Sequence, residues 1–552
     1  MKSQCQTMQN ETNIASALRQ QAESQPDGVA LIMPTRRTAS GWEDVRYTYR
    51  ELDELTDRLA AGLHANGMGP GTRVAFMVPP SLEFFALFFA FFKAGCVPVL
   101  VDPGIGLKPL KTCLGEAKPQ AFIGITKAQA ARMVLGWARD SIETVVSVGP
   151  RPFWQGLRYQ DLQEASADAF QAPESDPDGE AAILFTSGST GIPKGVVYRH
   201  RHMVAQVDLM REAFGMSPGE VDLPTFPPFA LFDPMLGMTT VIPKMDFTRP
   251  AKADPDMLVS MIEQYRVTNL FGSPALMNTL SRHLVANDLK LPGIRRMLSA
   301  GAPVHPHVIE RIHTAIEPPA DIHTPYGATE ALPVATVAGR ELVGELSDGN
   351  RSGQGICVGR PLSANEIRII PISDDAIDLT EYAGEVSDGE IGEICVCGPT
   401  VTDTYWAREK QTREAKMTDG QGRIWHRMGD LGWMDADGRL WYCGRKSERV
   451  RTVAGTMFTE CVEGPVNAID GVFRSALVGV GEPGEQEAVI VIEPEKGVDR
   501  AAVEVRVREV LDTREDTAAI KRIEFHKAFP VDIRHNAKIR RPQLAEWAAG
   551  RG

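Results

Sequence analysis

Short apolar runs alternate with longer stretches of helical periodicity between about residues 50 and 340. The strand-like runs are RVAFMV, VPVLV, AFIGI, AAILFT, VTNLFG and IRRMLSAG. Repeated alternation of this kind predicts βαβ units with mostly parallel sheets that are covered by helices. We expect ligands to bind at the loops that follow the carboxyl ends of these strands.

The pattern changes near residue 340. Shorter runs separated by Gly, Asp and Pro, such as NEIRIIPI, GEIGEICVCGPT and DADGRLWYCGR, predict an antiparallel, barrel-like region. After Gly444, the charged connector RKSERVRT precedes a helix from Thr459, the strands ALVGVG and AVIVIEP, a helix over about 499–513 and the strand RIEFH. We therefore expect an α/β protein. Its large N-terminal domain, 1–444, combines stacked α/β layers to about 340 with the barrel-like region over about 340–444, and a small, mobile α+β C-terminal domain spans 445–552.

The most apolar run is FFALFFAFF, residues 84–92. It is too short to span a bilayer, and the chain start MKSQCQTMQNETNIAS has no apolar core of the signal-peptide type. Charged residues, Glu83 and Lys93, flank the run, and AGCVPVLVDPG follows it as a turn into a buried strand. The pattern favours a buried helix over a lipid-contacting segment.

Composition and charge narrow the functional classes. A chain of 552 residues with 43% hydrophobic residues predicts several compact units with large cores. Its formal charge of −13 opposes non-specific attraction to nucleic acid, so a polyanionic ligand must be held locally. The eight cysteines form neither a CxxC pair nor a Cys/His cluster with zinc spacing. We expect a reduced, cytoplasmic protein without a structural metal, a transmembrane segment or a nucleic-acid partner.

A loop rich in Gly, Ser and Thr follows the buried strand near residue 184 and reads FTSGSTGIPKGVVYRH over 185–200. A Walker A loop would place Ser or Thr after the lysine, whereas Gly195 and Val196 follow Lys194 here. The glycines still permit close approach of the backbone to phosphate, the hydroxyls supply donors and Lys194 supplies positive charge. The loop therefore predicts a phosphate site of another kind.

TSGSTGIPKG resembles the signature loop of the adenylate-forming superfamily, which includes acyl-CoA synthetases, adenylation domains of peptide synthetases and beetle luciferase. Further stretches resemble the family in the same order: FKAGCVPVLVDP at 92–103, SAGAP at 299–303, YGATE at 326–330, RMGDLG at 427–432, GRKSERV at 444–450 and NAKIRR at 536–541. The resemblance implies attack of a carboxylate on the α-phosphorus of ATP, with Mg²⁺ as cofactor, to give an acyl adenylate and pyrophosphate.

The resemblance also implies roles for single residues. Thr329 would contact the α-phosphate, Glu330 would bind Mg²⁺, and Lys538 would neutralise charge between the carboxylate and the phosphate. Because Lys538 lies in the C-terminal domain, the site would assemble by rotation about Lys446 and Ser447.

The resemblance also divides the nucleotide among three sets of residues. The implied β- and γ-phosphate residues are Thr186, Ser187, Gly188, Ser189, Thr190, Gly191 and Lys194. The adenine ring would lie along Gly301, Ala302 and Pro303 and against Tyr326 and Gly327, and the ribose beside Asp430 and Arg445.

Three stretches depart from the common pattern of the superfamily. Val453 and Ala454 replace frequent glycines and would narrow a path for a thiol. The second stretch, FPPFALFDPMLG at 226–237, replaces the frequent PLFH pattern and places Ala230 where His is common. Its side chains Phe229, Leu231 and Phe232 would suit a long acyl chain, although ordinary core packing explains these apolar residues equally well. The third departure is Arg-His-Asn-Ala directly before the lysine.

These departures, together with VVYRHRH after the phosphate loop, resemble the olefin β-lactone synthetases of bacterial long-chain hydrocarbon biosynthesis. The resemblance implies ATP-dependent adenylation of a long-chain 2-alkyl-3-hydroxy fatty acid, followed by intramolecular displacement of AMP to give a β-lactone. The implied partners are this β-hydroxy fatty acid and other enzymes of the olefin pathway.

Two other functions stay open on the sequence. A long-chain acyl-CoA or acyl-carrier synthetase would need a thiol acceptor, and a non-catalytic nucleotide-binding scaffold would not need Lys194, Glu330, Asp430 and Lys538 together. The base for the hydroxyl proton is not assigned either, because His535, His200 and His202 are candidates by titration range alone.

Overall fold

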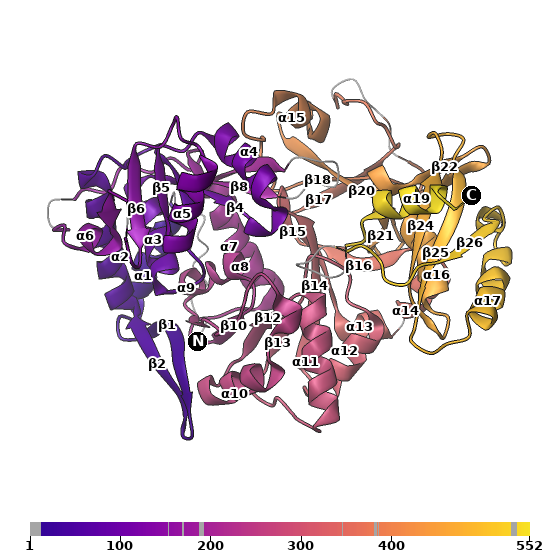
Figure 1. Ribbon diagram of the computed structural model, residues 1–552, viewed down its shortest axis with the longest axis horizontal. Helices are drawn as coiled ribbons and strands as arrows, with labels where there is room; N and C mark the ends of the chain where they lie inside the picture. Colours follow the sequence, from indigo (N-terminus) through magenta and orange to yellow (C-terminus); the bar gives the residue numbers. More distant parts are fainter. Residues whose placement is uncertain are drawn as a thin grey trace.

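The structure is a computed structural model that describes residues 13–551 except 153, 168–169, 187–192, 345, 380–383, 385 and 532–537. Two large sheets with their covering helices form most of the molecule, and a smaller α+β unit carries the C-terminus (Figure 1). The expected α/β class, with a large N-terminal and a small C-terminal domain, is confirmed.

The first sheet has seven strands in the order β7-β6-β5-β3-β4-β8-β9. Its neighbours are parallel except for β8 and β9, which form an antiparallel hairpin. The strands are β3 (Arg73–Met77), β4 (Val97–Val101), β5 (Ala121–Ile125), β6 (Thr144–Val148), β7 (Leu157–Arg158), β8 (Glu180–Thr186) and β9 (Lys194–Arg199). The helices of this part are α1 (Ile14–Ser24), α2 (Tyr49–Ala65), α3 (Leu82–Ala94), α4 (Leu107–Ala117), α5 (Thr126–Leu135) and α6 (Tyr159–Gln163).

The second sheet begins as a parallel α/β layer and ends as an antiparallel one. Its first part contains β1 (Val29–Thr38), β2 (Gly41–Thr48), β10 (Val221–Pro224), β11 (Thr239–Val241), β12 (Asn269–Phe271), β13 (Arg296–Leu298), β14 (Asp321–Ala328) and β15 (Ala331–Ala338). Its helices are α7 (His200–Phe214), α8 (Pro227–Ala230), α9 (Asp233–Leu236), α10 (Pro255–Tyr265), α11 (Pro274–Ala286), α12 (Pro306–His313), α13 (Gly339–Val343) and α14 (Ser347–Arg351).

The strands expected to be barrel-like are antiparallel to one another and continue this second sheet through β15 and β16. They are β16 (Ile356–Pro361), β17 (Glu366–Ile370), β18 (Gly392–Cys397), β19 (Lys416–Thr418), β20 (Ile424–Met434) and β21 (Leu440–Arg445), with the helix α15 (Glu409–Ala415) beside them. The edge hairpin of β1 and β2 was not expected from the sequence. β2 is the edge strand, and it pairs with β1, whose first half is buried while its second half from Thr35 is polar and exposed to water.

The C-terminal unit follows the short helix at Lys446–Glu448. A three-stranded sheet of β24 (Val472–Val480), β25 (Glu487–Pro494) and β26 (Arg522–Phe525) lies beside the hairpin of β22 (Val450–Thr452) and β23 (Gly455–Met457). Its helices are α16 (Thr459–Asn467), α17 (Arg500–Asp512), α18 (Glu515–Ala518) and α19 (Arg541–Ala549). Arg514 Nη1 joins this unit to the rest of the chain, because it donates to the carbonyls of Cys461 at 2.7 Å and Ser352 at 3.4 Å.

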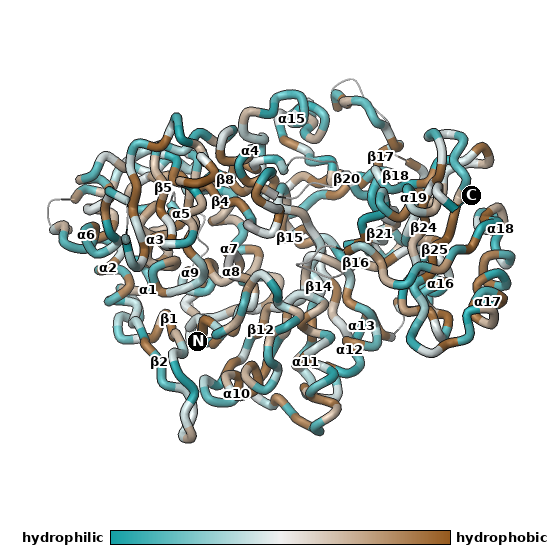
Figure 2. The backbone as a smooth tube through the Cα atoms, viewed as in Figure 1, coloured by the Kyte–Doolittle hydropathy of each residue, from teal (hydrophilic) through white to brown (hydrophobic). Residues whose placement is uncertain are grey.

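The apolar run at 84–92 forms the expected buried helix, α3. Ser81 accepts a hydrogen bond from the Phe84 amide at its start, and Gly95 ends it with a φ of 72°, a conformation that glycine adopts without strain. Lys93 lies inside the fold because its Nζ pairs with Asp53 Oδ1 at 2.6 Å and Asp57 Oδ1 at 2.7 Å. The hydropathy view places the helix within one of the most apolar parts of the molecule (Figure 2).

Candidate active site

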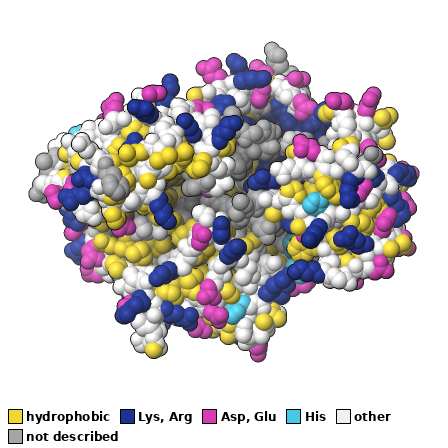
Figure 3. All heavy atoms as spheres, in the orientation of Figure 1, with side chains coloured by type: hydrophobic (Ala, Val, Ile, Leu, Met, Phe, Trp, Pro, Cys, Tyr) yellow, Lys and Arg dark blue, Asp and Glu magenta, His cyan; other side chains and the backbone are white. Residues whose placement is uncertain are grey.

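A cavity of about 2860 Å³ brings the predicted site residues together. Its walls come from both large sheets, from the helices between them and from residues 538–543 of the C-terminal unit. The space-filling view shows a hollow at the centre of the molecule, between the N-terminal part and the C-terminal unit (Figure 3). Residues more than 500 positions apart in the chain, such as Ile14 and Lys538, therefore line one cavity.

The phosphate side of the cavity begins at the hairpin of β8 and β9. Thr186 pairs with Lys194 in the register of this hairpin, so the two strands bring the ends of the glycine-rich loop together. The Lys194 ammonium lies 4.9 Å from the centre of the Tyr405 ring. The other predicted residues of this loop, Ser187, Gly188, Ser189, Thr190 and Gly191, lie outside the described residues.

Thr329 and Glu330 lie in the turn that joins β14 to β15, and three neighbours hold this turn. Tyr405 donates its hydroxyl to Glu330 Oε1 at 2.6 Å. The amide and hydroxyl of Thr402 donate to the Glu330 carbonyl at 2.9 and 3.1 Å. Tyr198 donates its hydroxyl to the Thr329 carbonyl. Backbone and side chain of the predicted metal ligand are thus both fixed by hydrogen bonds.

The donor set fits the predicted Mg²⁺. Mg²⁺ is usually held by one or two carboxylates together with phosphate oxygens and water. Glu330 lines the cavity, and among the described residues there is no cluster of three His, Cys, Asp or Glu side chains that would form an all-protein metal cage. Glu330 would hold the ion on the protein side, and the bound metal would supply positive charge beside the phosphates.

The predicted adenine slot is formed where β13 and β14 end. Gly301 has a φ of 94°, a positive value that glycine adopts without strain and other residues rarely adopt. Ala302 and Pro303 follow it along the cavity wall. A Cβ on Gly327 would lie 2.7 Å from the Ala331 carbonyl oxygen, so only glycine fits at this turn. Tyr326 is partly buried, and its ring lies 6.3 Å from that of Tyr442. The structure brings both predicted adenine segments, 301–303 and 326–327, to the same cavity.

The predicted ribose site centres on Asp430. Asp430 is paired with Arg445 in the register of β20 and β21, and Arg445 Nη1 lies 2.9 Å from Asp430 Oδ1. Tyr326 donates its hydroxyl to Asp430 Oδ2 at 2.7 Å. Among the described residues no hydrogen bond reaches Oδ1, although that oxygen is buried. Although Arg445 pairs with it as an ion, Oδ1 therefore keeps the capacity to accept a hydrogen bond from a hydroxyl group.

Charges around Asp430 connect this site to the C-terminal unit. Burial raises the pKa of Asp430, while the charges of Arg445 and Lys538 and the hydrogen bond from Tyr326 act in the opposite direction. Lys538 is exposed to solvent, lines the cavity and lies close enough to Asp430 for its charge to act on that carboxyl group. The predicted lysine thus faces the predicted ribose site in this arrangement of the two domains.

The apolar side of the cavity contains the predicted acyl-chain residues. Phe229, Leu231 and Phe232 all line it, between the end of β10 and the start of β11. The Phe229 ring stacks on Phe271 with the ring centres 4.5 Å apart. Core packing and cavity lining are both present here, because Leu231 is only 6% exposed and still borders the cavity.

Two side chains beside Glu330 were missed by the sequence reasoning. Tyr405, in the stretch TDTYW, orients the Glu330 carboxylate through its hydroxyl. A tyrosine in such a stretch does not by itself indicate this role in the sequence. Lys416, at the start of β19, donates to Thr402 Oγ1 at 3.2 Å. Burial lowers the pKa of Lys416 to about 7, despite the opposing charges of Glu330 and Asp403.

A base for the hydroxyl proton must reach the cavity, and the two described histidines considered for this role are buried away from it. His202 is fully buried, accepts a hydrogen bond from the Arg199 amide at 3.0 Å and lies 3.6 Å from Asp403. Burial lowers the pKa of His200 to about 4, and its ring packs against Phe92. Neither ring lines the cavity, and His535 lies outside the described residues.

Comparison with known proteins places the chain in a family. Residues 18–406 match the model of the family described as AMP-binding enzyme. A relative from Xanthomonas campestris pv. campestris, named olefin beta-lactone synthetase, is 51% identical and covers 97% of each chain. One from Stenotrophomonas maltophilia with the same name is 50% identical, covering 98% of this chain and 99% of its own.

Solved structures agree at the level of the fold. An amide bond synthetase from Marinactinospora thermotolerans superposes with a TM-score of 0.77 at 23% identity and covers 97% of this chain and 99% of its own. The chain belongs to the family of AMP-binding enzymes, so the predicted family membership is confirmed. It is an AMP-forming, acid-activating ligase. In the part of the chain that the structure describes, no helix combines the length and apolarity that a membrane crossing requires.

Proposed function

We propose that the protein uses ATP to adenylate a long-chain 2-alkyl-3-hydroxy carboxylic acid and then releases AMP by closing a β-lactone. The observation that carries this proposal is the identity of about half of all positions, over nearly the full chain, to two relatives named olefin beta-lactone synthetase. The expected neighbours in the reaction sequence are enzymes that supply a 2-alkyl-3-hydroxy acid and enzymes that consume a β-lactone.

In the first step a carboxylate oxygen forms a bond to the α-phosphorus, and the bond from that phosphorus to pyrophosphate breaks. Two anions must approach each other, so fixed positive charge is needed near both. Lys194 lies on the phosphate side and Lys538 on the ribose side of the cavity. We assign to Lys538 the neutralisation of the carboxylate and the α-phosphate while the new bond forms. Mg²⁺ held by Glu330 would supply further positive charge.

Asp430 and Tyr326 hold the nucleotide in place for this step. Oδ1 of Asp430, which pairs with Arg445 but receives no hydrogen bond among the described residues, is suited to accept hydrogen bonds from the ribose hydroxyls, and Arg445 keeps the carboxylate oriented. The glycine-containing segments at 301–303 and 326–327 both line the cavity, and we place the adenine ring beside them. These residues bind and orient, and the chemistry takes place beyond them at the α-phosphate.

In the second step the 3-hydroxyl oxygen of the substrate attacks the carbonyl carbon, the bond from that carbon to AMP breaks, and the hydroxyl proton is released. The nucleophile is part of the acyl group, so no entry path for a second substrate is required. Val453, in the hairpin between β22 and β23, is 87% exposed where the superfamily pattern has frequent glycines. Because Val453 points into solvent and does not line the cavity, the preference for intramolecular capture over a long-chain acyl-CoA synthetase activity rests on the similarity to the two named relatives.

Isotope transfer tests the order of bond formation. With ¹⁸O in both carboxylate oxygens, the adenylate route predicts one ¹⁸O in the phosphate of AMP, one in the lactone carbonyl and none in the ring oxygen. Mass spectrometry of AMP and of the lactone measures this distribution. Unlabelled AMP would show that the carboxylate never reached the α-phosphorus, and the proposal would then be wrong.

A further inference from the structure

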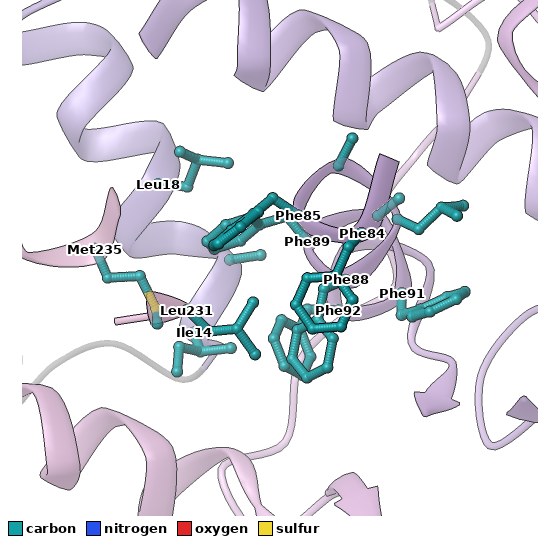
Figure 4. Packing of buried hydrophobic residues seen from close by; sticks show 14 of the residues in the cluster. Ile14, Leu18, Phe84, Phe85, Phe88, Phe89, Phe91, Phe92, Leu231 and Met235 are labelled. Carbon is teal, nitrogen blue, oxygen red and sulfur yellow. The ribbon is translucent and has the colours of Figure 1, made fainter. Parts of the chain in front are cut away.

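The helix α3 presents a stripe of three phenylalanines to the active-site cavity. Phe84, Phe88 and Phe92 are spaced four residues apart, lie on one face of the helix and all line the cavity. Phe85 and Phe89 belong to the same helix but are packed into the core instead. Figure 4 shows Phe88 and Phe92 on the side of Ile14 and Leu231, whereas Phe85 points toward Leu18. The helix is thus a core element on one face and a cavity wall on another.

Most neighbours of this stripe are apolar and buried, and the His200 ring packs against Phe92 at its end. Ile14, Leu231 and Met235 line the same region of the cavity, and each is at most 6% exposed. Asn13 Nδ2 donates to the Phe92 carbonyl at 3.0 Å and ties the start of α1 to the end of α3. Neighbouring rings brace the stripe, with ring centres 5.9 Å apart for Phe84 and Phe88 and 5.0 Å apart for Phe88 and Phe92. A hydrocarbon chain is the ligand that such a wall accommodates best.

A second aromatic wall lies on different elements. Phe226 directly precedes α8, Phe229 lies within it, and Phe271 ends β12. Their ring centres lie 4.5 to 6.1 Å from one another, and all three residues line the cavity. Leu231 and Phe232 connect this wall in sequence to Met235 beside α3. The apolar part of the cavity therefore has two aromatic walls rather than one.

Two walls match a branched substrate. In a 2-alkyl-3-hydroxy acid, one hydrocarbon chain leaves C2 and the other leaves C3, so two chains diverge from adjacent carbons. We infer that Phe84, Phe88 and Phe92 bind one of these two chains and limit its length, while the wall of Phe226, Phe229 and Phe271 contacts the other. This inference rests on the proposed function. It assigns to α3 a specificity-determining role in the reaction.

Chain-length profiles of two matched variants test the inference. Phe88→Trp narrows the cavity at the stripe, and Phe89→Trp makes the same change at the adjacent core position. Phe88→Leu and Phe89→Leu form a second, smaller pair, in case the larger side chain prevents folding at the core position. Each variant is checked by thermal melting. Pyrophosphate release is then measured with two substrate series, one lengthening only the C2 chain and one lengthening only the C3 chain.

The stripe should affect one series more than the other. Each methylene that no longer fits beside Phe88→Trp should lower kcat/KM by about fourfold, so the loss grows with length in one series only. Phe88→Leu should shift the preferred length of that same chain upward. The variants at Phe89 should change the melting temperature without changing either length profile.

Two results would overturn the inference. Equal losses in both series, or length profiles identical to the wild type, would remove α3 from substrate selection. A wild-type enzyme that releases pyrophosphate but forms no β-lactone would contradict the lactone step of the proposed function. That outcome would leave the chain-length comparison readable, because the comparison depends on adenylation alone.

Discussion

Replacing Tyr405 by Phe tests how the protein holds the predicted metal ligand. The substitution removes one hydroxyl and keeps the ring, which is 4% exposed and lies 4.9 Å from the Lys194 ammonium. The lost hydrogen bond joins the Tyr405 hydroxyl to Glu330 Oε1 at 2.6 Å. The perturbation therefore acts on the orientation of Glu330 and leaves the packing of the ring in place.

The size of the effect follows from the charge on the acceptor. A hydrogen bond to a charged group contributes about 1.5–3 kcal/mol, which corresponds to a loss of about 10- to 150-fold in kcat/KM if the whole term is lost in the transition state. Because Glu330 would hold Mg²⁺ beside the phosphates, Tyr405→Phe should also raise the Mg²⁺ concentration that gives half-maximal pyrophosphate release. Initial rates of pyrophosphate release over a Mg²⁺ titration measure both quantities.

Tyr49→Phe is the matched control. Tyr49 is also a buried tyrosine, but it donates to a neutral acceptor, the Met238 carbonyl at 2.7 Å, and does not line the cavity. We expect a loss of about 1 kcal/mol in the free energy of unfolding and an unchanged Mg²⁺ titration. The reasoning would be refuted if Tyr405→Phe showed the wild-type Mg²⁺ dependence, or if Tyr49→Phe shifted it equally.

Three further predictions concern charge. Lys538→Ala should lower adenylation by orders of magnitude while ATP binding, measured by calorimetry, stays largely intact; an unchanged rate would exclude Lys538 from the mechanism. Glu330→Gln should raise the Mg²⁺ requirement, and the same activity at limiting Mg²⁺ would contradict this role. Burial raises the pKa of Asp222 to about 7 and also raises the pKa of its hydrogen-bonded neighbour Asp233. Because the folded state then binds more protons than the unfolded state, the free energy of unfolding should fall as the pH rises through about 7. Asp233→Asn should flatten this fall in melting temperature between pH 6 and 8, and an unchanged slope would assign it to other groups.

Much of the fold followed from local patterns. Strands such as AFIGI and AVIVIEP are continuous apolar runs because they are buried on both faces, and each appears where the pattern predicted it. The polar outer half of the hairpin of β1 and β2 gave no such signal. Charged side chains such as Arg36 and Glu43 pair across its strands at the sheet edge, and this pairing depends on a neighbouring strand that local sequence does not indicate.

The sequence motifs predicted those site residues that lie within them, but not the contacts between these residues. The motifs indicated Asp430, Arg445 and Tyr326 individually, but their mutual contacts come from the register of β20 with β21 and from the packing of β14. Tyr405 lies outside those motifs, and only the fold brings it to Glu330. The run at 84–92 was correctly expected to be a buried helix, yet only the fold, which places Ile14, Leu231 and Met235 beside it, shows that one of its faces borders a cavity.

The central claim is intramolecular capture of the acyl adenylate, and product analysis tests it most directly. The purified enzyme is incubated with ATP, Mg²⁺ and a 2-alkyl-3-hydroxy fatty acid, with and without coenzyme A, and the products are identified by proton NMR. The account predicts a β-lactone and AMP in both reactions, in equal amounts. An acyl-CoA product that forms only when coenzyme A is present would contradict it and would indicate a long-chain acyl-CoA synthetase.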